Sequence, residues 1–161
     1  MTLILHDLEN ELFLKTPFSR IDDSVVINPN DILPCIGCFK CWTELPGTCA
    51  LKDKYSNNSL YLKNADKVII ISKNYYGSYS PIIKNFFDRS ISYVKPQFRK
   101  VYDEMHHVKR YKKKLNIEYY FYGDIEDNEK ETLEKLIKAN QENLDSNVLI
   151  NIIDIGEYCY E

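Results

Sequence analysis

The chain has 161 residues, enough for one full hydrophobic core but too few for two, so one domain spanning 1–161 is expected. At 44% hydrophobic and 28% charged residues, it has the composition of a soluble globular domain. A net charge of -3 and the lack of a long apolar stretch argue against nucleic-acid and membrane partners, and against a signal peptide. A cytoplasmic protein is therefore expected.

Five apolar or β-branched runs predict strands. The clearest has four consecutive β-branched residues at 68–71 between polar neighbours, which is typical of a strand buried on both faces of a sheet. In chain order, the predicted strands are 2–5, 24–27, 67–72, 115–122 and 148–155.

Three helical segments are predicted between the later strands, at 55–63, 80–92 and 126–144. The second begins with Ser80 as N-cap and Pro81 at the first helical position. Only a short connection separates the first two strands, so the first helix is expected to be short or missing. Residues 93–114 form a long connection without strong periodicity, and connections of that length are often functional.

Strands that alternate with helices imply crossover units and a mostly parallel sheet. The predicted fold class is therefore α/β, a flavodoxin-like three-layer fold with a five-stranded parallel sheet in the order 2-1-3-4-5. In such sheets ligands bind outside the carboxyl ends of the strands. The loops after the first, third and fourth strands are the places to search for a site.

The strongest local signal is a group of cysteines, Cys35, Cys38, Cys41 and Cys49, with the spacing C-x2-C-x2-C-x7-C. Thiolates at this spacing can converge on one inorganic centre, and Gly37 allows the chain to wrap around it. The pattern identifies these four thiols as candidate metal ligands.

Three interpretations of the cysteines stay open. A run of three at this spacing is typical of a 4Fe–4S cluster, which takes four thiolates. Zinc normally takes two pairs with a longer gap, and free thiols can also pack as small hydrophobic groups. Disulfides are disfavoured in the cytosol, and Cys159 is expected to be incidental.

A second signal is the tyrosine-rich segment after the third strand. Tyr75, Tyr76 and Tyr79 offer flat aromatic surface, and Gly77 permits a tight turn whose backbone N–H groups are exposed. The helix that begins at Ser80 adds its positive end nearby. A flavin ring needs such a wall, although a purely structural turn is the alternative.

At this point the sequence resembles a known family. Residues 65–72, 75–80 and 84–89 look like the strand, the Y-x-G-type flavin loop and the F-x-D-R helix end of the NADPH-dependent FMN reductase family. Residues 34–49 resemble the cysteine motif of its iron–sulfur flavoprotein branch. The segment beginning Tyr122-Gly123 is similar to the third flavin-side loop.

The resemblance covers roughly residues 30–145 and implies an electron-transfer oxidoreductase with FMN and a possible 4Fe–4S cluster. It also implies an electron donor such as NAD(P)H or ferredoxin, and a homodimer or higher oligomer. The cofactors do the chemistry, so no side chain is required as acid or base. The residues implied to bind flavin are Tyr75, Tyr76, Gly77, Ser78, Tyr79, Ser80, Tyr122 and Gly123, and those implied to bind the cluster are Cys35, Cys38, Cys41 and Cys49.

The sequence departs from this family after the first strand. The family usually has a Gly-, Ser- and Thr-rich loop there for the FMN phosphate, whereas residues 6–11 contain no glycine and three acidic side chains. A phosphate would meet like charge, so its anchor is unassigned, with Lys73, Arg89 or a second subunit as candidates. The competing hypothesis is a flavodoxin-like binding module that has lost its flavin.

Overall fold

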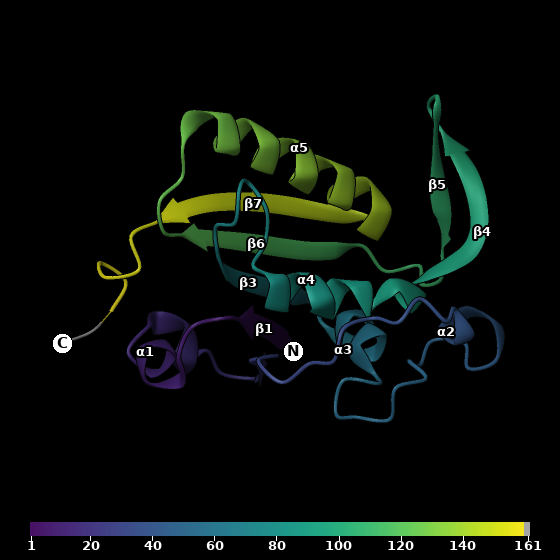
Figure 1. The fold of residues 1–161 in the computed structure, drawn as a ribbon, viewed down its shortest axis with the longest axis horizontal. Helices are drawn as coiled ribbons and strands as arrows, with labels where there is room; N and C mark the ends of the chain where they lie inside the picture. The colour runs from purple at the N-terminus through teal and green to yellow at the C-terminus, as the bar shows by residue number, and fades with distance from the viewer. Residues whose placement is uncertain (160–161) are drawn as a thin grey trace.

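The computed structural model describes residues 1–159 and contains a five-stranded, all-parallel sheet (Figure 1). The strand order β2-β1-β3-β6-β7 is the predicted 2-1-3-4-5 order, because β6 and β7 are the fourth and fifth strands of this sheet. The fold is therefore flavodoxin-like, as predicted. The strands are β1 (Thr2–His6), β2 (Ser24–Ile27), β3 (Lys67–Lys73), β6 (Leu115–Tyr122) and β7 (Ser146–Ile153).

Alternate residues of the strands supply two apolar layers, one on each face of the sheet. One layer packs against α3 (Asn58–Asn64), α4 (Pro81–Asp88) and α5 (Asp127–Leu144). The other packs against α1 (Asn10–Leu14) and the 3-10 turn η1 (Pro17–Arg20). The first helix is thus short, as expected. No helix among residues 1–159 has the length and apolar character needed to cross a bilayer.

The start of α4 follows its sequence signals. The Ser80 side chain accepts a hydrogen bond from the Ile83 backbone N–H, and Pro81 occupies the first position. The helix ends at Asp88, so the prediction of a helix to residue 92 is wrong. Ser90 donates its hydroxyl to the Phe86 carbonyl at 2.6 Å, which caps the last turn, and the 3-10 turn η2 (Ile91–Tyr93) follows.

The connection at 93–114 holds an antiparallel hairpin that the sequence analysis did not predict. Its strands are β4 (Val94–Val101) and β5 (Glu104–Lys109), and Figure 1 shows the hairpin standing beside the main sheet. Pro96 lies within a register shift of the ladder, and the turn at Tyr102–Asp103 lacks the glycine that usually marks hairpins. The short helix α2 (Lys40–Thr43) lies near the hairpin, where Trp42 Nε1 donates to the Val94 carbonyl at 3.0 Å.

Candidate functional site

The carboxyl ends of β1 and β3 meet at the point where the strand order reverses, the usual ligand position in this fold. Asp7, directly after β1, occupies this switch point. Its carboxylate accepts the Lys73 backbone N–H at 2.9 and 3.2 Å, the Tyr122 hydroxyl at 3.0 Å and the Ser72 hydroxyl at 3.3 Å. One acidic side chain therefore ties together the ends of β1, β3 and β6.

The space beneath Asp7 is filled by apolar side chains. His6 stacks on Phe13 with ring centroids 3.9 Å apart and an interplanar angle of 2°. Burial lowers the pKa of His6 to about 4, so the ring is neutral at physiological pH and supplies no positive charge. Leu8 and Phe18 are also buried here.

These residues do not fit the phosphate of FMN. The donors at the switch point already serve the Asp7 carboxylate. The helix that follows, α1, has five residues, Glu9 at its N-cap position and Glu11 in its first turn. A helix this short has only a weak positive potential at its N-terminus, and the two acidic side chains offset it.

The turn after β3 is rigid and presents an aromatic ring. Tyr75 and Ser78 exchange two backbone hydrogen bonds of 3.0 Å, while Tyr76 and Gly77 have φ of 54° and 76°, the pattern of a type I′ turn. A β-carbon at Gly77 would lie 2.6 Å from the Glu129 carbonyl oxygen, so the turn packs closely on α5. The Tyr76 side chain is 85% exposed and Tyr75 43% exposed.

The other predicted ring-binding residues of this turn lie deeper. Tyr79 is buried, stacks on Tyr119 and Phe121, and accepts the Asn140 amide at 2.6 Å. Burial raises the pKa of Tyr79 to about 12. Ser80 is buried as the cap of α4, whereas Ser78 is half-buried at the end of the turn. These residues support the turn, and Tyr75 and Tyr76 supply its exposed aromatic surface.

The third loop joins the same rim. The Asn74 amide donates to the Asp124 carbonyl and to the Glu129 carboxylate, both at 2.9 Å, and its oxygen accepts the Gly77 N–H at 3.0 Å. Sequence reasoning missed Asn74, although an asparagine before such a turn is a typical backbone-binding signal. Gly123 is exposed in this loop.

Tyr122 lies lower in the rim and faces the switch point. Burial and the neighbouring Asp7 carboxylate raise the pKa of Tyr122 well above its usual value, so the phenol keeps the proton that it donates to Asp7. The hydrogen-bonding role of Asp7 was also missed, because nothing in the local sequence indicates which donors the carboxylate reaches.

The four cysteines come together elsewhere, in one pocket that they line with Arg89 and Asp88. Burial, and then the thiols of the other three, raise the pKa of Cys41, so binding a metal here would release protons. As the side chains of residues 1–159 stand, however, no three His, Cys, Asp or Glu residues are arranged to hold a metal ion.

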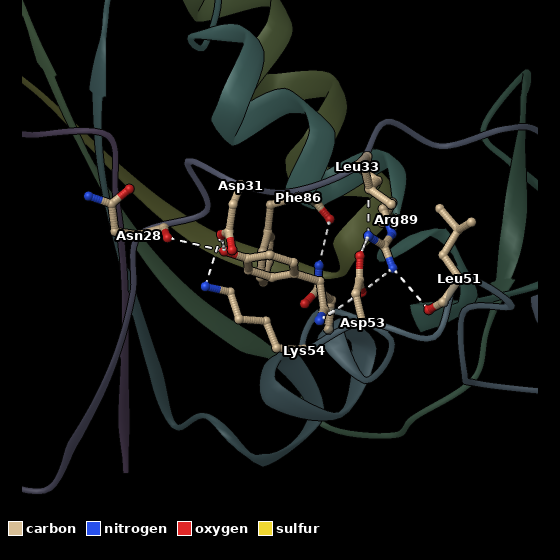
Figure 2. Close-up of polar contacts among 10 residues, drawn as sticks. Asn28, Asp31, Leu33, Leu51, Asp53, Lys54, Phe86 and Arg89 are labelled. Atoms are coloured by element: carbon tan, nitrogen blue, oxygen red, sulfur yellow. Dashed lines mark hydrogen bonds and ion pairs between the residues drawn. The ribbon is translucent and has the colours of Figure 1, made fainter.

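Arg89 anchors the segment that carries these cysteines (Figure 2). Its guanidinium is fully buried, donates to the Asp53 carboxylate at 2.5 and 2.7 Å, and reaches the Leu33 and Leu51 carbonyls at 3.4 and 3.3 Å. These contacts hold the chain on both sides of the cysteine segment. Because the side chain is committed here, Arg89 is not available as a phosphate anchor at the switch point.

The two sites lie at opposite ends of α4. The aromatic turn precedes the helix and the cysteine pocket borders its last residue, so the helix separates them by eight residues, or about 12 Å. Figure 1 likewise shows α2, which contains Cys41, at the far end of α4 from the turn after β3. Within one chain, the fold does not bring the cysteines beside the aromatic turn.

Comparisons with known proteins give one family. The family model described as NADPH-dependent FMN reductase matches residues 19–110, which include the cysteine segment and the turn after β3. This match covers more than half of the 161 residues. Comparison with curated protein sequences gives no match.

Several solved structures share the fold. An FMN-dependent NADH-azoreductase from Bacillus anthracis str. Ames Ancestor, in complex with FMN, has a TM-score of 0.56 and 15% identity, covering 98% of this chain and 91% of that one. Azoreductase AzrA has a TM-score of 0.54 and 15% identity, and the match covers 95% of this chain and 86% of that one. The apo form of an NADH:FMN oxidoreductase (EMOB) has a TM-score of 0.52 and 14% identity, and the match covers 94% of this chain and 75% of that one. At these identities the similarity concerns the fold.

Proposed function

The chain belongs to the NADPH-dependent FMN reductase family, and from this premise we propose that it is a flavin-dependent oxidoreductase. The flavin ring binds against the turn after β3, at the carboxyl edge of the sheet. NAD(P)H is the electron donor that the family description favours, with ferredoxin as the alternative.

One observation carries the assignment. Tyr76, inside the matched range, combines a positive φ of 54° with an 85% exposed ring at the edge where ligands of this fold bind. A bulky residue in the left-handed region costs about 1 to 2 kcal/mol, and such strain is concentrated at functional sites. Stacking against the planar ring of a flavin would account for a strained and exposed tyrosine at this position.

The chain's own residues would bind and orient the ring. Tyr75 and Tyr76 offer flat surface, and the Asn74 hydrogen bonds fix the turn before any ligand arrives. Tyr122 and Gly123 border the same rim from the third loop. A bound flavin would supply the exchange of hydride and of single electrons. No acid or base from the protein is required.

The test is a pair of tyrosine variants. Tyr76→Ala should weaken flavin binding, measured by quenching of flavin fluorescence, by about tenfold, since aromatic stacking contributes about 0.5 to 1.5 kcal/mol beyond buried area. Tyr102→Ala, at the 91% exposed tip of the hairpin, is the matched control and should bind as the wild type does. Failure of the wild-type protein to bind any flavin would instead favour the binding module without cofactor.

We also propose a 4Fe–4S cluster at Cys35, Cys38, Cys41 and Cys49. Its support is that all four thiols, at a spacing typical of such sites, line one pocket with a buried arginine beside it. Binding of the cluster would draw the four sulfur atoms together from their present positions around the pocket. The separation from the aromatic turn favours electron exchange with a partner protein or a second subunit over a direct contact within one chain.

Iron and acid-labile sulfide in protein purified without oxygen test the cluster. Cys38→Ser should remove both, while Cys159→Ser, a change of the fifth cysteine, should leave both unchanged. Wild-type protein with zinc, or without metal, would contradict the cluster and leave the flavin assignment untouched.

The resemblance also supports a homodimer or higher oligomer in the cytoplasm. Light scattering on the purified protein, with and without flavin, measures the oligomeric state. A monomer under both conditions would contradict that part of the proposal.

A further inference from the structure

The donors that line the switch point are already taken by an anion of the chain itself. The Asp7 carboxylate accepts the Lys73 N–H and the hydroxyls of Ser72 and Tyr122. These are a backbone amide and two hydroxyls, the kind of groups that bind phosphate oxygens in other proteins. A phosphate that entered here would have to displace the carboxylate.

Displacement of the Asp7 carboxylate is opposed by the packing of the residues on either side of it. Leu8, next to Asp7, is buried, and its carbonyl accepts the Asn28 amide at 2.9 Å. His6 on the other side is buried and stacked on Phe13. With both neighbours packed, the backbone at Asp7 is held in place, and the carboxylate can leave the switch point only by a side-chain rotation that gives up its hydrogen bonds.

The chain that follows Asp7 adds further negative charge. Glu9 and Glu11 follow within one turn of chain, and the buried His6 is neutral at physiological pH. The Lys73 side chain lies along the third loop, with its Cγ and Cε 3.6 and 3.7 Å from a β-carbon built on Gly123. A dianionic phosphate at the switch point would therefore face repulsion from a fixed carboxylate in a partly desolvated position.

We propose that Asp7 makes this site selective for flavin without a terminal phosphate, so that riboflavin is preferred to FMN. This inference rests on the proposed function, because it concerns the same flavin site. A ligand that ends in the uncharged ribityl chain meets no such repulsion from the carboxylate. Asp7 thus acts as a specificity-determining residue.

The first experiment compares dissociation constants of the wild-type protein for riboflavin and FMN by fluorescence quenching. We expect riboflavin to bind more tightly than FMN by about tenfold or more, because one repulsive charge interaction changes a binding constant by about that factor. FMN binding as tightly as riboflavin, or more tightly, would overturn this inference alone. Absence of binding to both flavins would overturn the proposed function as well.

The second experiment removes the charge and keeps the size of the side chain. Asp7→Asn should tighten FMN binding by about tenfold and leave riboflavin affinity nearly unchanged, because only FMN carries the repelled charge. Glu134→Gln, which also removes one acidic charge but lies on the exposed face of α5, should leave the preference unchanged. An equal effect of Asp7→Asn on both flavins would contradict the proposal.

A third measurement needs no variant and covers the case in which Asp7→Asn does not fold. Salt screens repulsion between like charges, so the FMN affinity of the wild type should rise with ionic strength while that for riboflavin stays level. FMN affinity that falls with added salt would indicate a cationic phosphate anchor and would overturn the inference.

Discussion

The rim at the carboxyl ends of the strands and the cysteine pocket at the far end of α4 are built in opposite ways. At the rim, Asp7 and Asn74 hydrogen-bond to backbone and side chains of three loops, and the polar groups are satisfied within the protein. In the pocket, the thiols of Cys35 and Cys38 are exposed, and Arg89 with Asp53 holds the segment from outside. The rim is therefore preformed, whereas the pocket is a set of donors whose final arrangement depends on what binds.

This difference suggests how each region responds to change. A steric clash introduced into the preformed rim should lower the free energy of unfolding, because the rim backbone is in close contact with α5. A loosely arranged pocket tolerates changes among its own residues but depends on its anchor. Four substitutions test this comparison, from the largest expected effect to the smallest.

Arg89→Ala should have the largest effect. It leaves the Asp53 carboxylate and two carbonyls without their buried donor, and we expect the free energy of unfolding to fall by about 4 kcal/mol in urea denaturation. Lys84→Ala, which removes an exposed ion pair with Asp88 from the same helix, should cost about 0.5 kcal/mol or less. Equal losses in the two variants would show that the pocket has no special anchor.

Gly77→Ala should cost about 3 kcal/mol, because it combines a φ of 76° with a β-carbon 2.6 Å from the Glu129 carbonyl oxygen. Gly37→Ala in the cysteine segment is the matched control, since its φ is 64° but nothing lies within 4 Å of the new atom. It should cost about 1 to 2 kcal/mol, the strain of the left-handed conformation by itself. If both variants lose the same stability, the rim is no more tightly packed than the cysteine segment.

The buried His6 predicts a pH dependence of stability. Its pKa falls from 6.5 to about 4 on folding, so the unfolded chain takes up the proton first as pH drops. Its contribution is fully present above pH 6.5 and is lost as pH falls toward 4, by about 2 kcal/mol between about pH 7 and pH 5. His6→Phe keeps an aromatic ring against Phe13 and should remove this part of the pH profile, measured by denaturation at each pH. An unchanged profile would contradict the assignment to His6.

Ser80→Ala should have the smallest effect, a loss of about 1 kcal/mol, because it removes the side-chain cap of α4 at the base of the turn. Ser78→Ala, in the same turn but outside the cap, should change thermal stability by less. A greater loss at Ser78 would indicate that the turn, rather than the cap, fixes where α4 begins.

Much of the fold could be predicted because its signals are local. The apolar runs gave all five strands of the main sheet, and the boundaries of two, 24–27 and 115–122, are confirmed. The last strand lies at Ser146–Ile153 rather than 148–155, because pairing with β6 sets its start, with Leu115 opposite Ser146. Pairing between distant segments does not appear in the local pattern. The family resemblance is confirmed as well.

The hairpin of β4 and β5 was missed for a related reason. Its strands lack the strict alternation and glycine turn that predict hairpins, and Trp42, far away in sequence, packs beside it through a hydrogen bond to Val94. Its position relative to the cysteine segment follows from this long-range contact.

The sequence by itself determined the five strands of the main sheet, the capped start of α4, the tyrosine turn and the cysteine spacing, since each depends on residues close together in the chain. Only the tertiary structure decided that the Asp7 carboxylate occupies the donors of the switch point and that α4 separates the thiols from Tyr76. Hydrogen-bond partners and distances between loops depend on how strands and helices pack, and a local pattern carries no record of that packing.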